Sequence, residues 1–241
     1  MAADPPGVRL MIGLWHWLTS PATWSGSEGA WALIGQHLGY SGVVMGLAAL
    51  IGIPLGLWVG HSGRGGSAVV NLVNGMRALP TLGLLYAAVL VIGPRLSGSA
   101  AFQVPAIGVL VILAVPPVLA GTYSGIDAVP PDAHDAATGM GMTGWQRLWW
   151  VEVPCALPLI LSGLRSAALQ VIATATLAAY VGLGGLGYFL QLGQGARDYP
   201  MMAGGSVLVA CLALVVDLVL AGVQKLVVSP GLSPESDSSD R

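Results

Sequence analysis

The sequence predicts an all-α membrane protein whose chain crosses the bilayer about five times. Its 241 residues are 55% hydrophobic and only 8% charged, whereas soluble domains carry about 25% charged residues. Long apolar runs alternate with short polar segments, and most runs approach the roughly 20 residues that a helix needs to cross a hydrocarbon core. Composition and pattern together therefore indicate a polytopic helical bundle.

Residues 1–36 are expected to form an interfacial helix and a loop. The apolar patch from Leu10 to Leu18 is too short to span a bilayer. Trp15 and Trp17 within it suit the headgroup region. A signal peptide is disfavoured because tryptophans fill the patch and no A-x-A site follows it. The stretch from Pro21 to Gly35, rich in Ser, Gly and Trp, is expected to be a loop.

The membrane domain is predicted over residues 37–225, and a disordered tail rich in Ser, Pro and Asp over 226–241. Arg77 and Pro80 interrupt the second predicted span. Residues 181–187 are too rich in glycine for a regular helix and predict a break after the fourth span. The five predicted spans are Leu38–Gly60, Ser67–Gly93, Ala100–Tyr123, Cys155–Ala179 and Met201–Gln224.

A dense polar segment over residues 130–154 separates the third and fourth spans. Pro130-Pro131 stops any helix arriving from upstream and suits a helix start. Asp132 places a carboxylate in the first turn, where the helix dipole favours an anion. Gly139 and Gly141 weaken this helix and allow a left-handed exit. The first half of the segment is therefore predicted to be one short helix.

A second short helix is predicted in the same polar segment. Thr143 and Gln146 have the spacing of a capping box, in which each residue satisfies a free backbone N–H of the other. Pro154 and Pro158 come after it, and they are expected to bend or restart the helix as it enters the fourth span.

The residues of this segment resemble the EAA loop of bacterial ABC importer permeases. The family pattern is E-A-A, three residues, G, nine residues, I, one residue, L-P. Asp135-Ala136-Ala137 matches its start, with Asp in place of Glu. Glycine falls six and proline nineteen residues after Asp135, and Val replaces both Ile and Leu. Two longer stretches, GMGMTGWQRLWWVEVPCALPLILSGLR and ATLAAYVGLGGLG, are similar to sequences of the osmoprotectant branch of this family (glycine betaine, choline, proline). The resemblance extends from about Leu38 to Lys225.

The resemblance implies a type I ABC importer permease fold with about five transmembrane helices and a cytoplasmic coupling helix. In that family the loop lies in a groove of the ATPase subunit and transmits closure of the ATPase dimer to the membrane helices. The residues that would couple to the ATPase here are Asp132, Asp135, Ala136, Ala137, Gly139, Gly141 and Pro154.

The resemblance also implies that the chain lies in the lipid of the bacterial plasma membrane and works with partner proteins. They are an ATPase dimer, a second permease subunit that is identical or paralogous, and an extracytoplasmic substrate-binding protein. The sequence contains no P-loop G-x-x-x-x-G-K-[ST], so ATP and Mg would belong to the partner ATPase. No cofactor, metal ligand or catalytic residue is expected in this chain, and no basic patch suits a nucleic acid.

Charge places the polar segment in the cytoplasm, independently of the resemblance. With five spans, Arg64, Arg147 and Lys225 fall on one side, and Arg95 and Arg197 on the other. The positive-inside rule makes the first side cytoplasmic. The segment over residues 130–154 and the C-terminus are therefore expected to face the ATPase.

Three charged residues lie within apolar runs, where charge is costly and usually faces a bundle interior or cavity. Counted from the cytoplasmic ends, Arg77, Arg165 and Asp217 are roughly 12 to 16 Å deep at 1.5 Å per residue. We expect Asp217 to pair with one of the two arginines near the inner end of a pathway. A static structural pair and a gate are equally compatible with this pattern.

A quaternary ammonium would be attracted by aromatic ring faces rather than by hydrogen-bond acceptors. Candidates along the pathway are the membrane tyrosines and two nearby hydroxyls: Tyr86, Tyr123, Tyr180, Thr174 and Thr176. Packing or lipid-interface roles for these residues are the simpler alternative.

Other functions remain open at this stage. A methionine or amino-acid importer permease shares GGLG-like segments with the osmoprotectant branch. A self-contained secondary carrier would often show internal repeats, and we find no convincing repeat. A membrane enzyme is disfavoured because the sequence holds no HExxH and no G-x-S-x-G. Co-purification of an ATPase would separate the importer from the other two.

Overall fold

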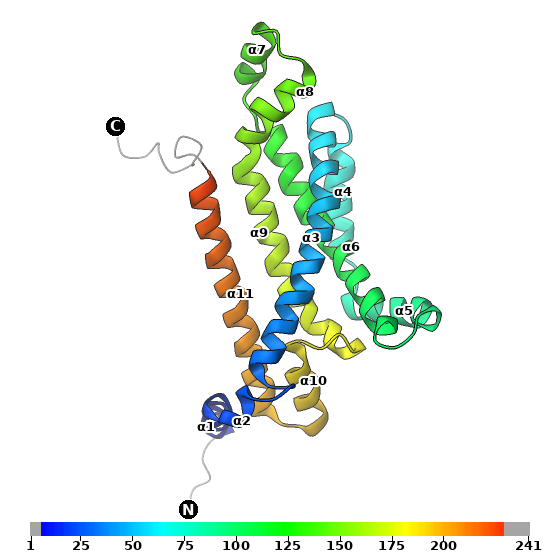
Figure 1. The fold of residues 1–241 in the computed structure, drawn as a ribbon, viewed down its shortest axis with the longest axis vertical. Helices are drawn as coiled ribbons and strands as arrows, with labels where there is room; N and C mark the ends of the chain where they lie inside the picture. The colour runs from blue at the N-terminus through cyan, green and yellow to red at the C-terminus, as the bar shows by residue number, and fades with distance from the viewer. Residues whose placement is uncertain (1–5, 229–241) are drawn as a thin grey trace, which may run out of the picture. The chain divides into compact units, whose positions relative to one another are not determined.

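A computed structural model describes residues 6–228, and every regular element within that range is helical. Short helices and 3₁₀ or π-helical turns separate the long ones (Figure 1). In chain order the elements are α1 (Pro6–Thr19), α2 (Pro21–Trp24), α3 (Ala30–Ser62), α4 (Gly66–Arg77), α5 (Thr81–Ile92), η1 (Gly93–Arg95), α6 (Ala100–Asp127), α7 (Pro131–Gly139), α8 (Gly144–Arg147), η2 (Leu148–Glu152), α9 (Val153–Ala178), η3 (Ala179–Val181), α10 (Gly187–Ala196) and α11 (Tyr199–Val227).

The predicted spans correspond to four long apolar helical segments and one broken pair. The four are α3, α6, the segment over residues 144–181, and α11. The second predicted span, Ser67–Gly93, is instead two helices, because α4 ends at Arg77 and α5 begins at Thr81. Pro80 explains the break, since it lacks an N–H and disfavours helical geometry at the residue before it.

The expected loop from Pro21 to Gly35 is partly wrong. Pro21 starts the short helix α2, and α3 begins at Ala30, before the expected start of the first span. Side chains tie this connection to α1: Thr23 Oγ1 donates to the carbonyl of Trp17 at 2.6 Å, and Trp24 Nε1 donates to that of Leu18 at 2.7 Å. At the other end, the tail predicted over residues 226–241 starts too early, because α11 continues to Val227, and the residues from 229 on lie outside the described range.

The chain divides into two compact units, and the four long helical segments each contribute to both. Unit 1 contains residues 1–44, 80–110 and 169–216, and unit 2 contains residues 45–79, 111–168 and 217–241.

In unit 2, glycines allow α3 to lie close to α6 (Figure 1). Gly52, Gly56 and Gly60 recur every four residues, and a Cβ on any of them would come within 3 Å of a side chain of α6. Small residues at this spacing are typical of close helix packing in membranes. Gly121 of α6 and Gly163 of α9 face each other, and a Cβ on either would overlap the other backbone. The three helices therefore form a tightly packed core.

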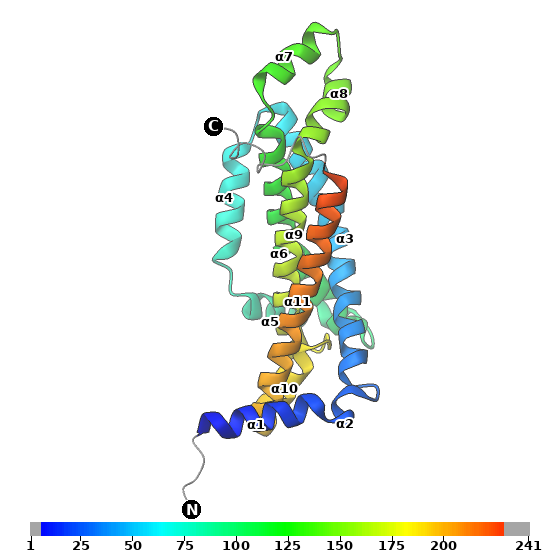
Figure 2. The ribbon, with the colours of Figure 1, turned by 90° about the vertical axis from the view of Figure 1, so that its left-hand side faces the viewer.

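The helix α4 packs on the outside of that core in unit 2, beside α6 (Figure 2). Val69 of α4 joins a buried cluster with Val59 of α3 and Leu119 of α6. Tyr123 packs against the same cluster.

In unit 1, α1 lies across the start of α11 and beside α10 (Figure 2). Trp17 makes an edge-on contact with Phe189 of α10, with ring centroids 4.9 Å apart. A Cβ on Gly204 of α11 would overlap the Trp17 ring, so the glycine is required for this approach. The predicted N-terminal helix is confirmed, and one face of it is held against protein.

Candidate functional site

The predicted coupling segment folds as two short helices. Pro131 begins α7, and Asp132 lies in its first turn. The exit is left-handed at Gly141, whose φ is 79°, whereas Gly139 is the last residue of α7 and keeps helical geometry. The predicted helix is confirmed, and only one of the two glycines provides the exit.

The second helix begins with the predicted capping box. Thr143 Oγ1 accepts from the backbone N–H of Gln146 at 3.3 Å, and Gln146 Oε1 accepts from that of Thr143 at 2.8 Å. After one turn, α8 widens into the π-helical turn η2, which ends at Glu152. Pro154 is the second residue of α9, and a widened turn before it accommodates a proline that cannot donate to the carbonyl of residue 150.

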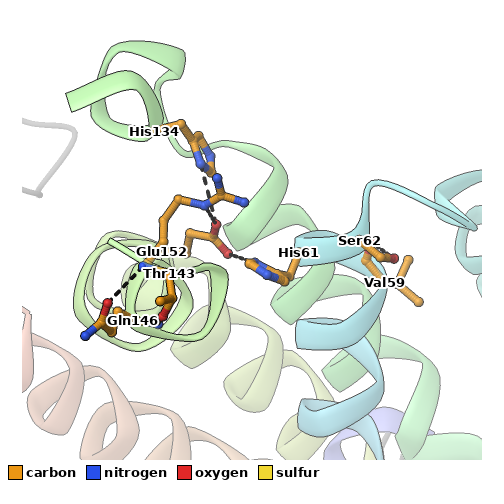
Figure 3. Close-up of polar contacts among 8 residues, drawn as sticks. Val59, His61, Ser62, His134, Thr143, Gln146 and Glu152 are labelled. Carbon is orange, nitrogen blue, oxygen red and sulfur yellow. Dashed lines mark hydrogen bonds and ion pairs between the residues drawn. The ribbon is translucent and has the colours of Figure 1, made fainter. Parts of the chain in front are cut away.

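A buried carboxylate, Glu152, lies at the centre of the segment (Figure 3). Its side chain is only 1% exposed. His61 Nδ1 lies 2.7 Å from Oε2, Arg147 Nε donates to Oε1 at 2.9 Å, and His134 Nδ1 lies 3.5 Å from Oε1. We call these four residues the Glu152 hub. It ties the end of α3 to α7, α8 and η2.

The hub explains how a short polar segment keeps one shape. A carboxylate removed from water is costly unless it is paired and hydrogen-bonded, and here both oxygens have partners. Two of those partners come from outside η2 and α8, so a displacement of α7 or of the end of α3 changes the environment of the charge. Movement of one element is therefore energetically linked to the others.

The sequence interpretation missed the hub. Glu152 occupies a variable position of the EAA pattern, and His61, ninety-one residues earlier, lies in the last turn of α3. One signal was available: Glu152 is the only charged residue in the run from Leu148 to Leu164, where an acid needs a partner.

The predicted coupling residues divide between an exposed and a buried face. Ala137 is 1% exposed and anchors α7. The other predicted residues are exposed: Asp132, Asp135, Ala136, Gly139, Gly141 and Pro154. At the α7–α8 turn a shallow pocket of about 240 Å³ is lined by Met140, Gly141, Met142, Gln146 and Trp150. This face is suited to receiving a protein surface.

The predicted ion pair within the membrane helices is present in unit 2. Arg165 of α9 binds Asp217 of α11 in a bidentate manner, with Nε to Oδ1 at 2.5 Å and Nη2 to Oδ2 at 2.8 Å. The pairing is confirmed, and its role as a gate stays a prediction. Arg77 is the end of α4, and its side chain lies outside the described part of the structure.

The five residues predicted to line a substrate pathway do not all lie together in the structure. Tyr86 and Tyr180 line one pocket in unit 1. Tyr123 belongs to unit 2, where a Cβ on Gly66 would overlap its hydroxyl. Thr174 and Thr176 donate to carbonyls of their own helix, those of Gln170 and Ala173. The structure therefore brings together two of the five predicted residues.

Comparison with known proteins agrees with this geometry. Residues 52–229 match the family described as "Binding-protein-dependent transport system inner membrane component". The chain is 35% identical over 198 residues to the Bacillus subtilis "Glycine betaine/carnitine/choline transport system permease protein OpuCB", covering 82% of this chain and 88% of the relative. It is 32% identical over 197 residues to the Salmonella typhimurium "Osmoprotectant import permease protein OsmW", covering 82% and 91%.

Solved structures share the fold. A chain of the MetNI methionine ABC transporter in an inward-facing conformation superposes with a TM-score of 0.70 at 22% identity, covering 81% of this chain and 94% of that one. A bacterial ABC transporter involved in the import of alginate gives 0.62 at 17% identity, covering 92% and 90%. Sequence identities this low establish the permease fold alone. The family match over residues 52–229 and the relatives at 32–35% identity establish more: the chain belongs to the family of binding-protein-dependent transport system inner membrane components.

Proposed function

We propose that this chain is the membrane permease subunit of an ATP-driven importer for quaternary ammonium osmoprotectants. The single observation that carries the coupling role is the α7–α8 segment, which is held on the Glu152 hub and presents Asp132, Asp135 and Ala136 to the outside. Relatives at 32–35% identity are named for glycine betaine, carnitine and choline. All three compounds carry a trimethylammonium group, so this group defines the proposed substrate class.

In the proposed mechanism a separate ATPase dimer binds the exposed face of α7 and the α7–α8 turn. Closure of the dimer displaces α7, and the hub passes the displacement to the end of α3 and the start of α9 through His61 and Glu152. ATP and Mg are held by the ATPase. The distribution of arginine and lysine supports a cytoplasmic position for this segment and for the C-terminus.

Two further partners belong to the proposal. A second permease subunit, identical or paralogous, would complete the pathway, and an extracytoplasmic binding protein would deliver the substrate. A methionine importer is the alternative within the same architecture, and the substrate names of the sequence relatives favour the osmoprotectant class over it. A self-contained carrier has no use for an exposed coupling segment of this kind.

The test is ATPase activity of the purified assembly in lipid, with binding protein and with glycine betaine, choline, proline or methionine. We expect stimulation by the quaternary amines and its loss in Asp135→Lys, because a cation replaces an exposed carboxylate on the proposed docking face. Asp127→Lys is the matched control, since it makes the same charge change at another exposed residue, outside the coupling segment.

Three results would contradict parts of the proposal. Stimulation by methionine alone would keep the architecture and reject the substrate class. Equal loss in Asp127→Lys and Asp135→Lys would reject a specific docking role for α7. Transport by the chain without any associated ATPase would reject the importer itself and leave a self-contained carrier.

A further inference from the structure

Three aromatic residues from separate elements line one open pocket in unit 1. The pocket has a volume of about 290 Å³. Its rings come from α5, α6 and η3, and none of its lining residues carries a charge. The lining residues are Tyr86, Val89, Phe102, Tyr180, Val181 and Gly182.

A hydrogen bond holds one of the three rings, and the other two belong to exposed residues. Tyr180 donates its hydroxyl to Gln194 Oε1 of α10 at 2.7 Å, which fixes the direction of its ring. Tyr86 and Phe102 are 47% and 48% exposed. The pocket therefore offers open aromatic surface rather than a filled core.

The glycine-rich stretch after η3 forms one wall of the pocket. Gly182 has a φ of 87°, a conformation that strains any other residue. A Cβ there would lie 3.5 Å from Cγ of Phe102. The absence of a side chain at this position leaves the Phe102 ring accessible from the wall.

Two side chains of α3 hold this wall. His37 is 1% exposed, and its Nδ1 accepts from the backbone N–H of Leu186 at 3.3 Å. Its Nε2 must then carry the proton and donate to the carbonyl of Ile172 at 3.1 Å, which makes the ring neutral. Gln36 Oε1 accepts from the N–H of Gly185 at 3.3 Å. The loop is thus positioned by α3 as well as by its own backbone.

We propose that this pocket binds the trimethylammonium group of the substrate inside the permease. Such a group has no N–H to donate, so hydrogen-bond acceptors cannot hold it, whereas the faces of aromatic rings attract a cation without a donor. Three rings with no competing charge provide that attraction. The inference rests on the substrate class proposed above and assigns Phe102 and the loop over residues 181–186 to the binding of that substrate.

Thiol reactivity beside the rings tests the pocket directly. The substitution Val89→Cys places a thiol among the lining residues without removing a ring, after the two native cysteines are replaced by Cys155→Ser and Cys211→Ser. The assembly is treated with a trimethylammonium-ethyl thiosulfonate or with a neutral methyl thiosulfonate. We expect the ratio of cationic to neutral reaction rates to fall about three- to tenfold when Phe102→Leu is added. Choline should slow the reaction, and its neutral carbon isostere dimethylbutanol should not.

Matched variants isolate the role of the ring faces. Tyr86→Phe should keep the rate ratio and Tyr86→Leu should lower it, because the ring and not the hydroxyl attracts the cation. Leu90→Cys is the positional control: Leu90 is next to Val89 on α5, is 73% exposed, and does not line the pocket. Its rate ratio should not respond to Phe102→Leu.

The proposal is overturned by a ratio that Phe102→Leu leaves unchanged, or by protection that choline and dimethylbutanol give equally. It is also overturned if neither reagent reacts, since lipid or the second permease subunit would then cover the rings. The readout needs no ATP hydrolysis. Normal stimulation by quaternary amines with an unchanged ratio would reject the pocket alone. A selective ratio without such stimulation would reject the importer function and keep the pocket.

Discussion

In each unit, one buried ionisable side chain holds an irregular segment of the chain in place. The two side chains hold their segments by opposite means. In unit 2, Glu152 gathers side chains from α3, α7 and α8 around a charge. In unit 1, His37 is neutral and binds two backbone groups, the N–H of Leu186 and the carbonyl of Ile172. The first arrangement depends on charge and the second on hydrogen bonds alone.

The difference matches what each segment is proposed to do. Glu152 brings together elements from different parts of the chain, because it contacts His61 of α3 and His134 of α7 as well as the nearby guanidinium of Arg147, and the strength of such contacts to a carboxylate changes with small displacements. A neutral ring bound to backbone groups fixes a loop in one place. The α7–α8 segment is therefore suited to the proposed response to an ATPase, whereas the loop beside the aromatic pocket is held in one position.

The largest effect is expected from Glu152→Gln, which keeps the volume of the side chain and removes its charge. Breaking a buried ion pair from one side costs about 3–5 kcal/mol. We expect the lower end, because Arg147 is 29% exposed and can turn toward water. Thermal unfolding should shift downward, and the ATPase subunit should co-purify poorly.

Asp127→Asn is the control for Glu152→Gln, because it changes an exposed carboxylate at the end of α6 to an amide in the same way. It should leave both readouts unchanged. Equal behaviour of the two variants would show that the hub contributes nothing specific, and the proposed contrast between the units would not hold.

A smaller effect is expected from breaking the ion pair of Arg165 and Asp217, which can be compared with the Glu152 hub because both lie in unit 2. This pair joins two helices rather than four elements, and both side chains are partly exposed. Asp217→Asn should lower the yield of assembled protein several-fold, because it leaves a cation in an apolar run. The exchange Arg165→Asp with Asp217→Arg should restore assembly.

Transport by the exchanged variant separates a structural pair from a gate. Restored assembly with restored transport indicates a static pair. Restored assembly without transport indicates that the position of each charge matters for the pathway. An exchange that assembles no better than the single variant would show that the observed pair does not stabilise the protein.

The sequence was informative wherever local chemistry decides the structure. The capping box of Thr143 and Gln146, the proline start of α7 and the glycine break after α9 are each determined by residues close together in the chain. The partner of Asp217 was also limited to two arginines, because so few charges lie in the apolar runs. These features needed no knowledge of how the helices pack.

The remainder depends on contacts between distant residues. Nothing local marks His61 as the partner of Glu152, or His37 as the support of a loop 149 residues away. The same limit explains the aromatic candidates: composition selected Tyr86 and Tyr180, but it gave Tyr123 equal weight and omitted Phe102. Helix packing, which sequence periodicity does not determine here, decides which rings meet.

The smallest effect is expected from His37→Leu, which tests whether the neutral His37 ring holds the loop after η3 in place. The change puts an apolar side chain in the buried site and leaves the N–H of Leu186 without its partner, whereas the carbonyl of Ile172 lies within α9 and keeps its helical hydrogen bond. One unsatisfied buried group costs about 1–3 kcal/mol, and backbone relaxation offsets part of this. We expect a moderate loss of thermal stability with normal binding of the ATPase, because no charge is left unpaired and the coupling segment is untouched.

Ser41→Ala, one turn along α3, is the matched control for His37→Leu. The Ser41 hydroxyl is buried and has no hydrogen-bond partner among the described residues, so its removal should cost no stability. If His37→Leu also releases the ATPase, then the loop and the coupling segment are energetically linked and the two supports are not independent. If it lowers stability while the rate ratio at the aromatic pocket also falls, then the neutral support acts on the wall of the pocket, as its contacts indicate.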